Sequence, residues 1–315
     1  MTQSQSSTGP ELYSSAQFAI ELDGDKSLTS LRSIDGGHAK TEILTYHSGT
    51  KNLGVLRQNG KRKYEDIKLV MGMAAGPAMW NWMNSFIAGT CERRNGALVA
   101  ADKNYVEKAR RLFKEAIISS IDFPSFNSTD KNPATVTVTV SPETMVYTVG
   151  DGGNIAAPDP DGGPTGENQR QKHVSACNFH FSYHGASDGA MKRVTKVDAF
   201  SVKTKIVEYH HAGRHEPIKL AGKVEWPNIA FYLPEIEAQF FIDLHTKTMS
   251  GQPAPIGAAE LSYFDNNRRP RGVVEFEGCR IFSVAPDKHD ATNEEVRQVK
   301  VEMAVESITV KPKGS

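Results

Sequence analysis

The chain has 315 residues, 38% of them hydrophobic, and its 37 Lys and Arg residues balance 37 Asp and Glu residues. This length predicts about two domains, and the absence of net charge disfavours a protein that coats nucleic acid or an anionic membrane. Three widely separated cysteines, Cys91, Cys177 and Cys279, exclude a disulfide framework and favour a reduced, cytosolic product.

Taken in chain order, the sequence predicts a β-rich first half. We expect residues 1 to 15 to be flexible, because they are rich in Ser, Thr and Gln and lack the basic start and apolar run of a signal peptide. No stretch reaches the length of a transmembrane helix. Strands are expected at 17 to 22, 28 to 34 and 39 to 47, with the turn Asp35-Gly36-Gly37 joining the last two as an antiparallel pair. The polar residues 48 to 62 predict an extended loop.

A single helix is expected in this half. It covers residues 77 to 88, where Pro77 suits the first helical position, Gly89 suits the end, and the apolar residues have helical spacing. Strands precede and follow it at 64 to 73, 96 to 102, 108 to 123 and 134 to 148. Residues 149 to 175 are rich in Gly, Pro, Asp and Asn, which predicts a linker between domains.

The second half predicts the same order of elements. Strands are expected at 178 to 184, 191 to 197 and 200 to 210, then a polar loop at 211 to 220 and a strand at 223 to 233. A helix at 235 to 248 would place Ile236, Phe240, Phe241 and Leu244 on its apolar side, and strands at 258 to 265, 272 to 284 and 296 to 310 would close the domain.

Matched segments about 163 residues apart indicate an internal duplication. Residues 41 to 47, TEILTYH, correspond to residues 204 to 210, TKIVEYH, and the alternating valines of 136 to 140 correspond to 299 to 303. The sequence therefore predicts a mainly β protein with two tandem antiparallel β-barrel or sandwich domains, at residues 16 to 148 and 176 to 311, each with one flanking α-helix. No polar constellation is preserved between the halves, which indicates assembly rather than catalysis.

The candidate chemical sites are weak. His210, His211 and His215 form the densest histidine cluster, but they lack a cysteine or carboxylate at ligand spacing, so a polar loop is favoured over a metal site. Asp159 and Asp161 resemble the start of a calcium loop, yet its twelfth position is Arg170 instead of Glu.

Three other groups of residues favour structural roles. Cys91 or Cys279 could pair with a distant histidine, but a chain of this length offers that combination by chance, and no nucleophile elbow or phosphate-binding loop is present. Trp80 and Trp82 point about 200° apart on a helix and so cannot form one stacking face, which predicts Trp80 in the core. Arg268, Arg269 and Arg271 predict a solvated hairpin turn rather than a phosphate site. We therefore expect no catalytic residues, cofactor or metal.

Each half resembles the tail tube protein family of contractile phages and related injection machines, which is similar to type VI secretion tube proteins. The resemblance is carried by the segments FAIELDG (18 to 24), KTEILTYHSG (40 to 49) and YEDIKL (64 to 69), by the helix with WNWMN (80 to 84), and by Arg94-Asn-Gly96 and the strand 113 to 123. It covers nearly all of residues 17 to 148 and, in a more diverged form, 176 to 311. The duplication, the linker and the absence of the tryptophans from the second helix depart from the family pattern.

The resemblance implies a non-enzymatic structural protein in which six barrels close into a ring around a channel and the rings stack into a tube. Hairpins at 28 to 47 and 191 to 210 would face the channel, and loops at 48 to 62 and 211 to 220 would contact the next ring. Expected partners are further copies of the chain, sheath and baseplate proteins, and DNA or effectors that pass without sequence-specific binding.

Two arrangements stay open, with three chains or six chains per ring. The alternatives to a main tube protein are a tube initiator or baseplate adaptor joined to a threefold hub, or a soluble tandem-barrel binding module. The expected location is the virion or injection particle, after synthesis in the host cytoplasm.

Overall fold

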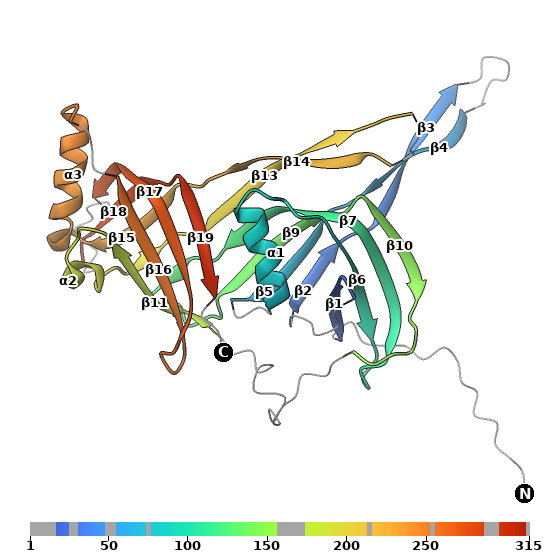
Figure 1. The fold of residues 1–315 in the computed structure, drawn as a ribbon, viewed down its shortest axis with the longest axis horizontal. Helices are drawn as coiled ribbons and strands as arrows, with labels where there is room; N and C mark the ends of the chain where they lie inside the picture. The colour runs from blue at the N-terminus through green and yellow to red at the C-terminus, as the bar shows by residue number, and fades with distance from the viewer. Residues whose placement is uncertain are drawn as a thin grey trace, which may run out of the picture.

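The computed structural model describes residues 17–24, 31–47, 55–73, 77–155, 174–212, 216–252, 256–286 and 296–312. Over these residues the chain is mainly β, with antiparallel sheets of nine, eight and two strands. Figure 1 shows an elongated molecule in which the first half of the chain lies at the right and most of the second half at the left, while two long strands of the second half, coloured yellow, extend over the first half.

The described residues of the first repeat form ten strands and one helix. They are β1 (Phe18–Leu22), β2 (Leu31–Gly36), β3 (Ala39–His47), β4 (Val55–Tyr64), β5 (Ile67–Gly72), α1 (Pro77–Ile87), β6 (Arg94–Ala101), β7 (Glu107–Phe123), β8 (Phe126–Asn127), β9 (Thr135–Ser141) and β10 (Thr144–Val149). The second repeat contains β11 (Val174–Tyr183), α2 (Asp188–Met191), β12 (Lys196–Val197), β13 (Phe200–Tyr209), β14 (Ile218–Glu225), β15 (Ile229–Pro234), η1 (Glu235–Glu237), α3 (Gln239–Met249), β16 (Gly257–Asp265), β17 (Pro270–Pro286), β18 (Gln298–Ala304) and β19 (Ser307–Pro312).

The duplication predicted from the sequence extends to the strand register. β7, β9 and β10 begin 163 residues before β17, β18 and β19, and α1 begins 162 residues before α3. Hairpin 1 (β3 and β4) and hairpin 2 (β13 and β14) carry the same irregularity, because the register shifts between Thr41 and Ile43 in one and between Thr204 and Ile206 in the other. A β-bulge at equivalent positions is a feature that duplicated domains share by descent.

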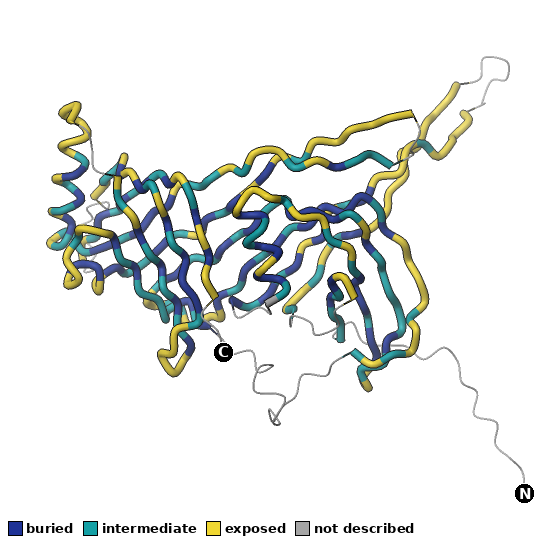
Figure 2. Tube along the Cα trace, in the orientation of Figure 1, coloured by how far each residue is buried: buried dark blue, intermediate teal, exposed yellow. Residues whose placement is uncertain are grey.

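Each core is enclosed by a long strand that takes part in two layers. β7 pairs with β6 and β10 through its first part and with β9 through its last part. The change of direction lies at Glu115, whose φ is 51°, and the equivalent residue of β17 is Gly278, whose φ is 67°. Valines of β9 that alternate with threonines fill the core side of the sheet, and Figure 2 shows buried segments continuing through both repeats.

The sequence prediction was wrong about how the hairpins are made. Strands 28 to 34 and 39 to 47 were expected to pair, but β2 pairs with β5, and β3 pairs with β4. Gly36 and Gly37 both have positive φ, so the chain leaves the first sheet there and enters the hairpin instead of turning back. Residues 55 to 62, expected in a loop, form most of β4, and residues 218 to 220, also expected in a loop, begin β14. Residues 55 to 62 were missed because these mostly exposed residues do not alternate between apolar and polar.

Other elements differ from expectation in smaller ways. Of the strand expected at 191 to 197, only the two-residue β12 forms. Met191 instead ends the short helix α2, which the Ser187 hydroxyl caps. The helix expected at 235 to 248 begins as the 3₁₀ turn η1 and continues as α3. Ile236, expected on its apolar side, is exposed because it lies in η1 before the amphipathic helix starts. Residues 156–173 of the linker lie outside the described residues, so the domain boundaries stay predictions.

Candidate assembly interface

The two repeats are joined edge to edge by an exchange of strands. Residues 200 to 203 of β13 pair with residues 120 to 123 at the end of β7, so hairpin 2 extends a sheet of the first repeat. In return, β8 of the first repeat pairs with β12 and so extends the sheet of the second repeat. Backbone pairing of this kind converts exposed strand edges, which otherwise favour aggregation, into a specific interface.

Aromatic side chains fill the centre of this junction. Phe123 of the first repeat stacks on Phe200 of the second, with ring centroids 4.7 Å apart, and Phe200 meets the edge of Phe276 at 5.6 Å. All three rings are buried. Such pairs contribute about 0.5–1.5 kcal/mol each beyond the burial of their area, so the junction has the character of a core.

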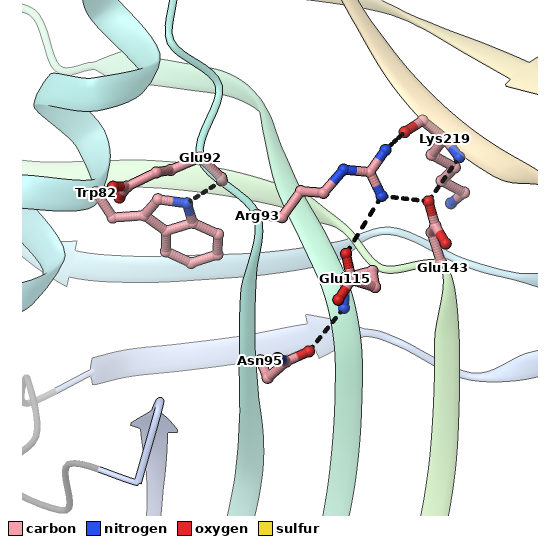
Figure 3. Close-up of polar contacts among 7 residues, drawn as sticks. All are labelled: Trp82, Glu92, Arg93, Asn95, Glu115, Glu143 and Lys219. Carbon is pink, nitrogen blue, oxygen red and sulfur yellow. Dashed lines mark hydrogen bonds and ion pairs between the residues drawn. The ribbon is translucent and has the colours of Figure 1, made fainter.

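A charged cluster fastens hairpin 2 to the first repeat (Figure 3). The Arg93 guanidinium donates to the Glu143 carboxylate and to the backbone carbonyl of Lys219 on β14. Glu143 also accepts a hydrogen bond of 3.0 Å from the backbone N–H of Lys219. Arg93 lies 3.5 Å from Glu115, whose backbone N–H donates to Asn95 at 2.9 Å. One carboxylate therefore binds both repeats at once.

Lys219 is a buried cation at this contact, with 5% of the residue exposed. Its ammonium donates to the Ser141 hydroxyl at 2.9 Å and lies 3.8 Å from Asp66, to which Ser141 donates at 2.5 Å. Burial lowers the pKa of Lys219, and the charges of Asp66, Glu208 and Glu143 oppose that shift. A buried ammonium group needs hydrogen-bond acceptors and carboxylates of this kind around it. The cluster therefore favours a basic residue at this position of hairpin 2.

Helix α1 provides a further contact between the repeats. It contacts β19 of the second repeat as well as β7 of its own repeat, and Figure 1 shows it standing between them. Six apolar side chains of this helix are buried: Met79, Trp80, Trp82, Met83, Phe86 and Ile87. Trp80 lies in the core as predicted, and Trp82, on the other side of the helix, is also buried and donates from Nε1 to the Glu92 carbonyl at 2.9 Å.

The sheet face opposite the core is polar in both repeats. On β9, Thr135, Thr137 and Thr139 alternate with buried valines, and on β18, Lys300 and Glu302 alternate with buried apolar residues. The charges on β18 are paired at 2.6 Å. Nearby, Lys196 pairs with Asp198 at 2.7 Å. This face is suited to contact with water or a passing polymer rather than to packing against another protein core.

The residues singled out in the sequence do not gather into a chemical site. His210 and His211 are exposed at the end of hairpin 2, while His215 and the Asp159 to Arg170 segment lie outside the described residues. No group of three or more metal-ligating side chains occurs among the residues that the structure describes. Cys279 is a buried free thiol, and Cys91 is a partly exposed one.

The basic run forms the predicted hairpin turn, between β16 and β17. Asp265 organises it: its carboxylate accepts hydrogen bonds from the backbone N–H groups of Asn267 and Arg269 and from the Arg271 guanidinium.

Over the described residues, no helix is long and apolar enough to cross a membrane.

Sequence reasoning missed the residues that make the junction, namely Phe123, Phe200, Arg93, Glu143 and Lys219. They lie far apart in the chain and belong to no motif. The one available signal was the repeat itself, because Glu143 recurs as Glu306 while Arg93 becomes Ile256, which points to a charged group that acts differently in the two copies.

Comparison with known protein families finds a match within the first half of the chain. Residues 14–146 match the family described as T4-like virus tail tube protein gp19. A search of curated proteins finds no match.

Among solved structures, the chain is similar to a protein of the sheath-tube complex of an extracellular contractile injection system, PVC, at 16% identity and TM-score 0.39, covering 44% of this chain and 93% of that one. It is similar to a protein of the anti-feeding prophage tube-terminating cap at 18% identity and TM-score 0.40, covering 46% and 96%. It is also similar to Hcp1 from Flavobacterium johnsoniae at 13% identity and TM-score 0.27, covering 44% and 98%.

Proposed function

We propose, because residues 14–146 match the T4-like virus tail tube protein family, that the whole chain is a structural tail tube subunit that contributes two neighbouring barrels to one ring. The observation that carries the proposal is the exchange of strands between the repeats through β13 with β7 and β8 with β12. Two barrels joined in this way would form one arc of the ring. Six barrels, the number implied by the resemblance, then correspond to three chains rather than six.

The polar sheet face supplies a suitable channel wall. It carries threonines in the first repeat and closely paired charges in the second. Paired charges and hydroxyls bind a sliding polymer weakly, because neither offers an uncompensated charge or an apolar surface. DNA or effectors would pass along this face without sequence-specific contact, and the chain would carry no enzymatic activity.

A second role, as a tube initiator or baseplate adaptor, is favoured by one observation. The two repeats differ at equivalent positions of the junction, so a ring of three chains has threefold symmetry with two kinds of barrel. Such a ring could join a sixfold tube to a threefold hub. Sheath and baseplate proteins would be the partners in either role.

Mass photometry of the purified chain, with negative-stain electron microscopy of the same sample, tests the proposal. Three chains of 34.5 kDa give 3 × 34.5 = 103.5 kDa and six give 6 × 34.5 = 207 kDa. We expect rings with a central hole at the lower mass. Tubes that lengthen without other proteins favour the main tube, closed rings that do not grow favour the adaptor, and a monomer that persists at high concentration contradicts both.

A further inference from the structure

Over the described residues, each end of the molecule lacks a strand partner that the internal junction has. At the junction between repeats, residues 120 to 123 of β7 pair with β9 on one side and β13 on the other. The equivalent residues 283 to 286 of β17 pair with β18 on one side, and no second strand pairs with them among the described residues. Within the part of the chain that the structure describes, β3, the equivalent of β13, pairs only with β4, in a two-stranded sheet.

Hairpin 1 exposes the surface that hairpin 2 buries. Lys219 and Thr204 of hairpin 2 are buried, and Lys219 contacts Glu143 and Ser141 of the first repeat. The residues at the same register positions of hairpin 1, Arg57 and Thr41, are exposed. Ile206 is half-buried, whereas its equivalent Ile43 is 64% exposed. The two hairpins share their strand pairing and their bulge, so the difference in exposure reflects the presence of a neighbouring repeat.

The surfaces of α1 and β19, which meet inside the molecule, are more buried than the equivalent surfaces of α3 and β10 at its two ends. α1 contacts β19, and Val310 of β19 is 1% exposed, whereas Tyr147, its equivalent in β10, is 57% exposed. Ile87 near the end of α1 is 5% exposed, and its equivalent Met249 on α3 is 76% exposed. Figure 1 places β10 and hairpin 1 at one end of the long axis and α3 with β17 at the other.

The charged cluster has a partial counterpart at the outer ends. Glu306 occupies the position of Glu143 and pairs with Arg280 at 3.3 Å, with 63% of its side chain exposed. In hairpin 1 the position of Lys219 is held by Arg57. A carboxylate and a guanidinium therefore lie on opposite ends, at the positions where the internal junction brings Glu143 to the Lys219 backbone.

We propose that the end of the molecule formed by β17 and α3 docks onto hairpin 1 and β10 of a second copy of this chain, head to tail. The internal junction predicts the register: Val202 lies opposite Ile121, so Ala39 of one chain would lie opposite Val284 of the next. α3 would then cover Tyr147, and Glu306 would approach Arg57. The inference deepens the proposed function and rests on it, because three such contacts close the ring.

The junction between the two repeats inside one chain should be stronger than the contact between two chains. Phe123 and Phe200, which stack inside the chain, are replaced at the outer contact by Pro286 and Gly37. Without this aromatic core, the contact between chains depends on backbone pairing and on the α3 and β10 surfaces. Rings would therefore dissociate into folded monomers before the repeats separate.

Cysteine cross-linking tests the register. In a variant whose native cysteines are replaced, A39C chains mixed with V284C chains should form disulfide-linked dimers on mild oxidation, and the double variant A39C/V284C should form a covalent trimer. The control H38C with V284C is displaced by one residue, so the side chains point to opposite faces and the yield should fall at least tenfold. Strong cross-linking of A39C chains to one another would overturn the proposal, because it indicates that two hairpins pair.

These experiments distinguish a failure of the proposed ring from a failure of the proposed register. Rings of three chains without the A39C to V284C cross-link would overturn the proposed docking and leave the proposed function standing, and absence of rings would overturn the proposed function.

As a second measurement that leaves the backbone unchanged, Tyr147→Ser and Met249→Ser should each raise the dissociation constant between chains about tenfold. Tyr209→Ser, a matched change at the exposed end of hairpin 2, should leave it unchanged. An equal effect of all three variants would contradict the assignment of the surfaces.

Discussion

Replacing Glu143 with glutamine should weaken the union of the two repeats much more than the same change at Glu306. The Glu143 side chain is 1% exposed and accepts from both the Arg93 guanidinium and the Lys219 backbone. Glutamine keeps the shape of the side chain but removes its negative charge. Its amide N–H group would also face the N–H donors of Arg93 and Lys219. Breaking a buried ion pair costs about 3–5 kcal/mol, and because Arg93 is 32% exposed and can regain water, we expect the lower end, about 3 kcal/mol.

Glu306→Gln is the matched control, because Glu306 holds the same place in the second repeat but is an exposed surface partner of Arg280. Loss of such a pair costs about 0–1 kcal/mol. The assay is urea unfolding monitored by tryptophan fluorescence, at a concentration where mass photometry finds the monomer. Equal, small losses for both variants would refute the conclusion that the internal cluster holds hairpin 2 on the first repeat.

Three further predictions concern stability and reactivity. A double-mutant cycle of Phe123→Ala and Phe200→Ala, measured by urea unfolding, should give a coupling of about 1 kcal/mol, since the rings stack; strict additivity would show that they do not interact. Gly278→Ala should lower the free energy of unfolding by about 1–2 kcal/mol or more, because φ is 67° and the new Cβ would lie 2.5 Å from the Cβ of Glu306; unchanged stability would contradict this geometry. Burial raises the pKa of Cys279 to about 11, so at pH 8 its thiol should react with Ellman's reagent only after unfolding; rapid reaction of the native protein would place this thiol at the surface.

The sequence predicted the parts of the fold that have one buried and one exposed face. β9 and β18 alternate between valine or methionine inside and polar residues outside, and their order gave the duplication. α1 was predicted at nearly its observed limits, because Pro77 begins it and Gly89, with positive φ, follows it. These signals are local and depend on burial within one repeat.

The hairpins and the junction were beyond local signals. β4 is exposed over nearly its whole length, so its residues show no alternation in the isolated chain. Phe123 ends one strand and Phe200 begins another, 77 positions later, and nothing in either neighbourhood indicates that the two rings stack. In the proposed ring, the exposure of hairpin 1 and the missed strand β4 have one origin, because another copy of the chain would contribute the surface that buries hairpin 1.

An electron cryomicroscopy reconstruction of the ring, calculated without imposed symmetry, tests the central claim most directly. The account predicts six barrels in one layer, alternating between barrels that carry the tryptophan helix α1 and barrels that carry α3, with continuous sheet density where β17 of one chain meets β3 of the next. A ring of six first repeats, with the second repeats projecting outside it, would contradict the account.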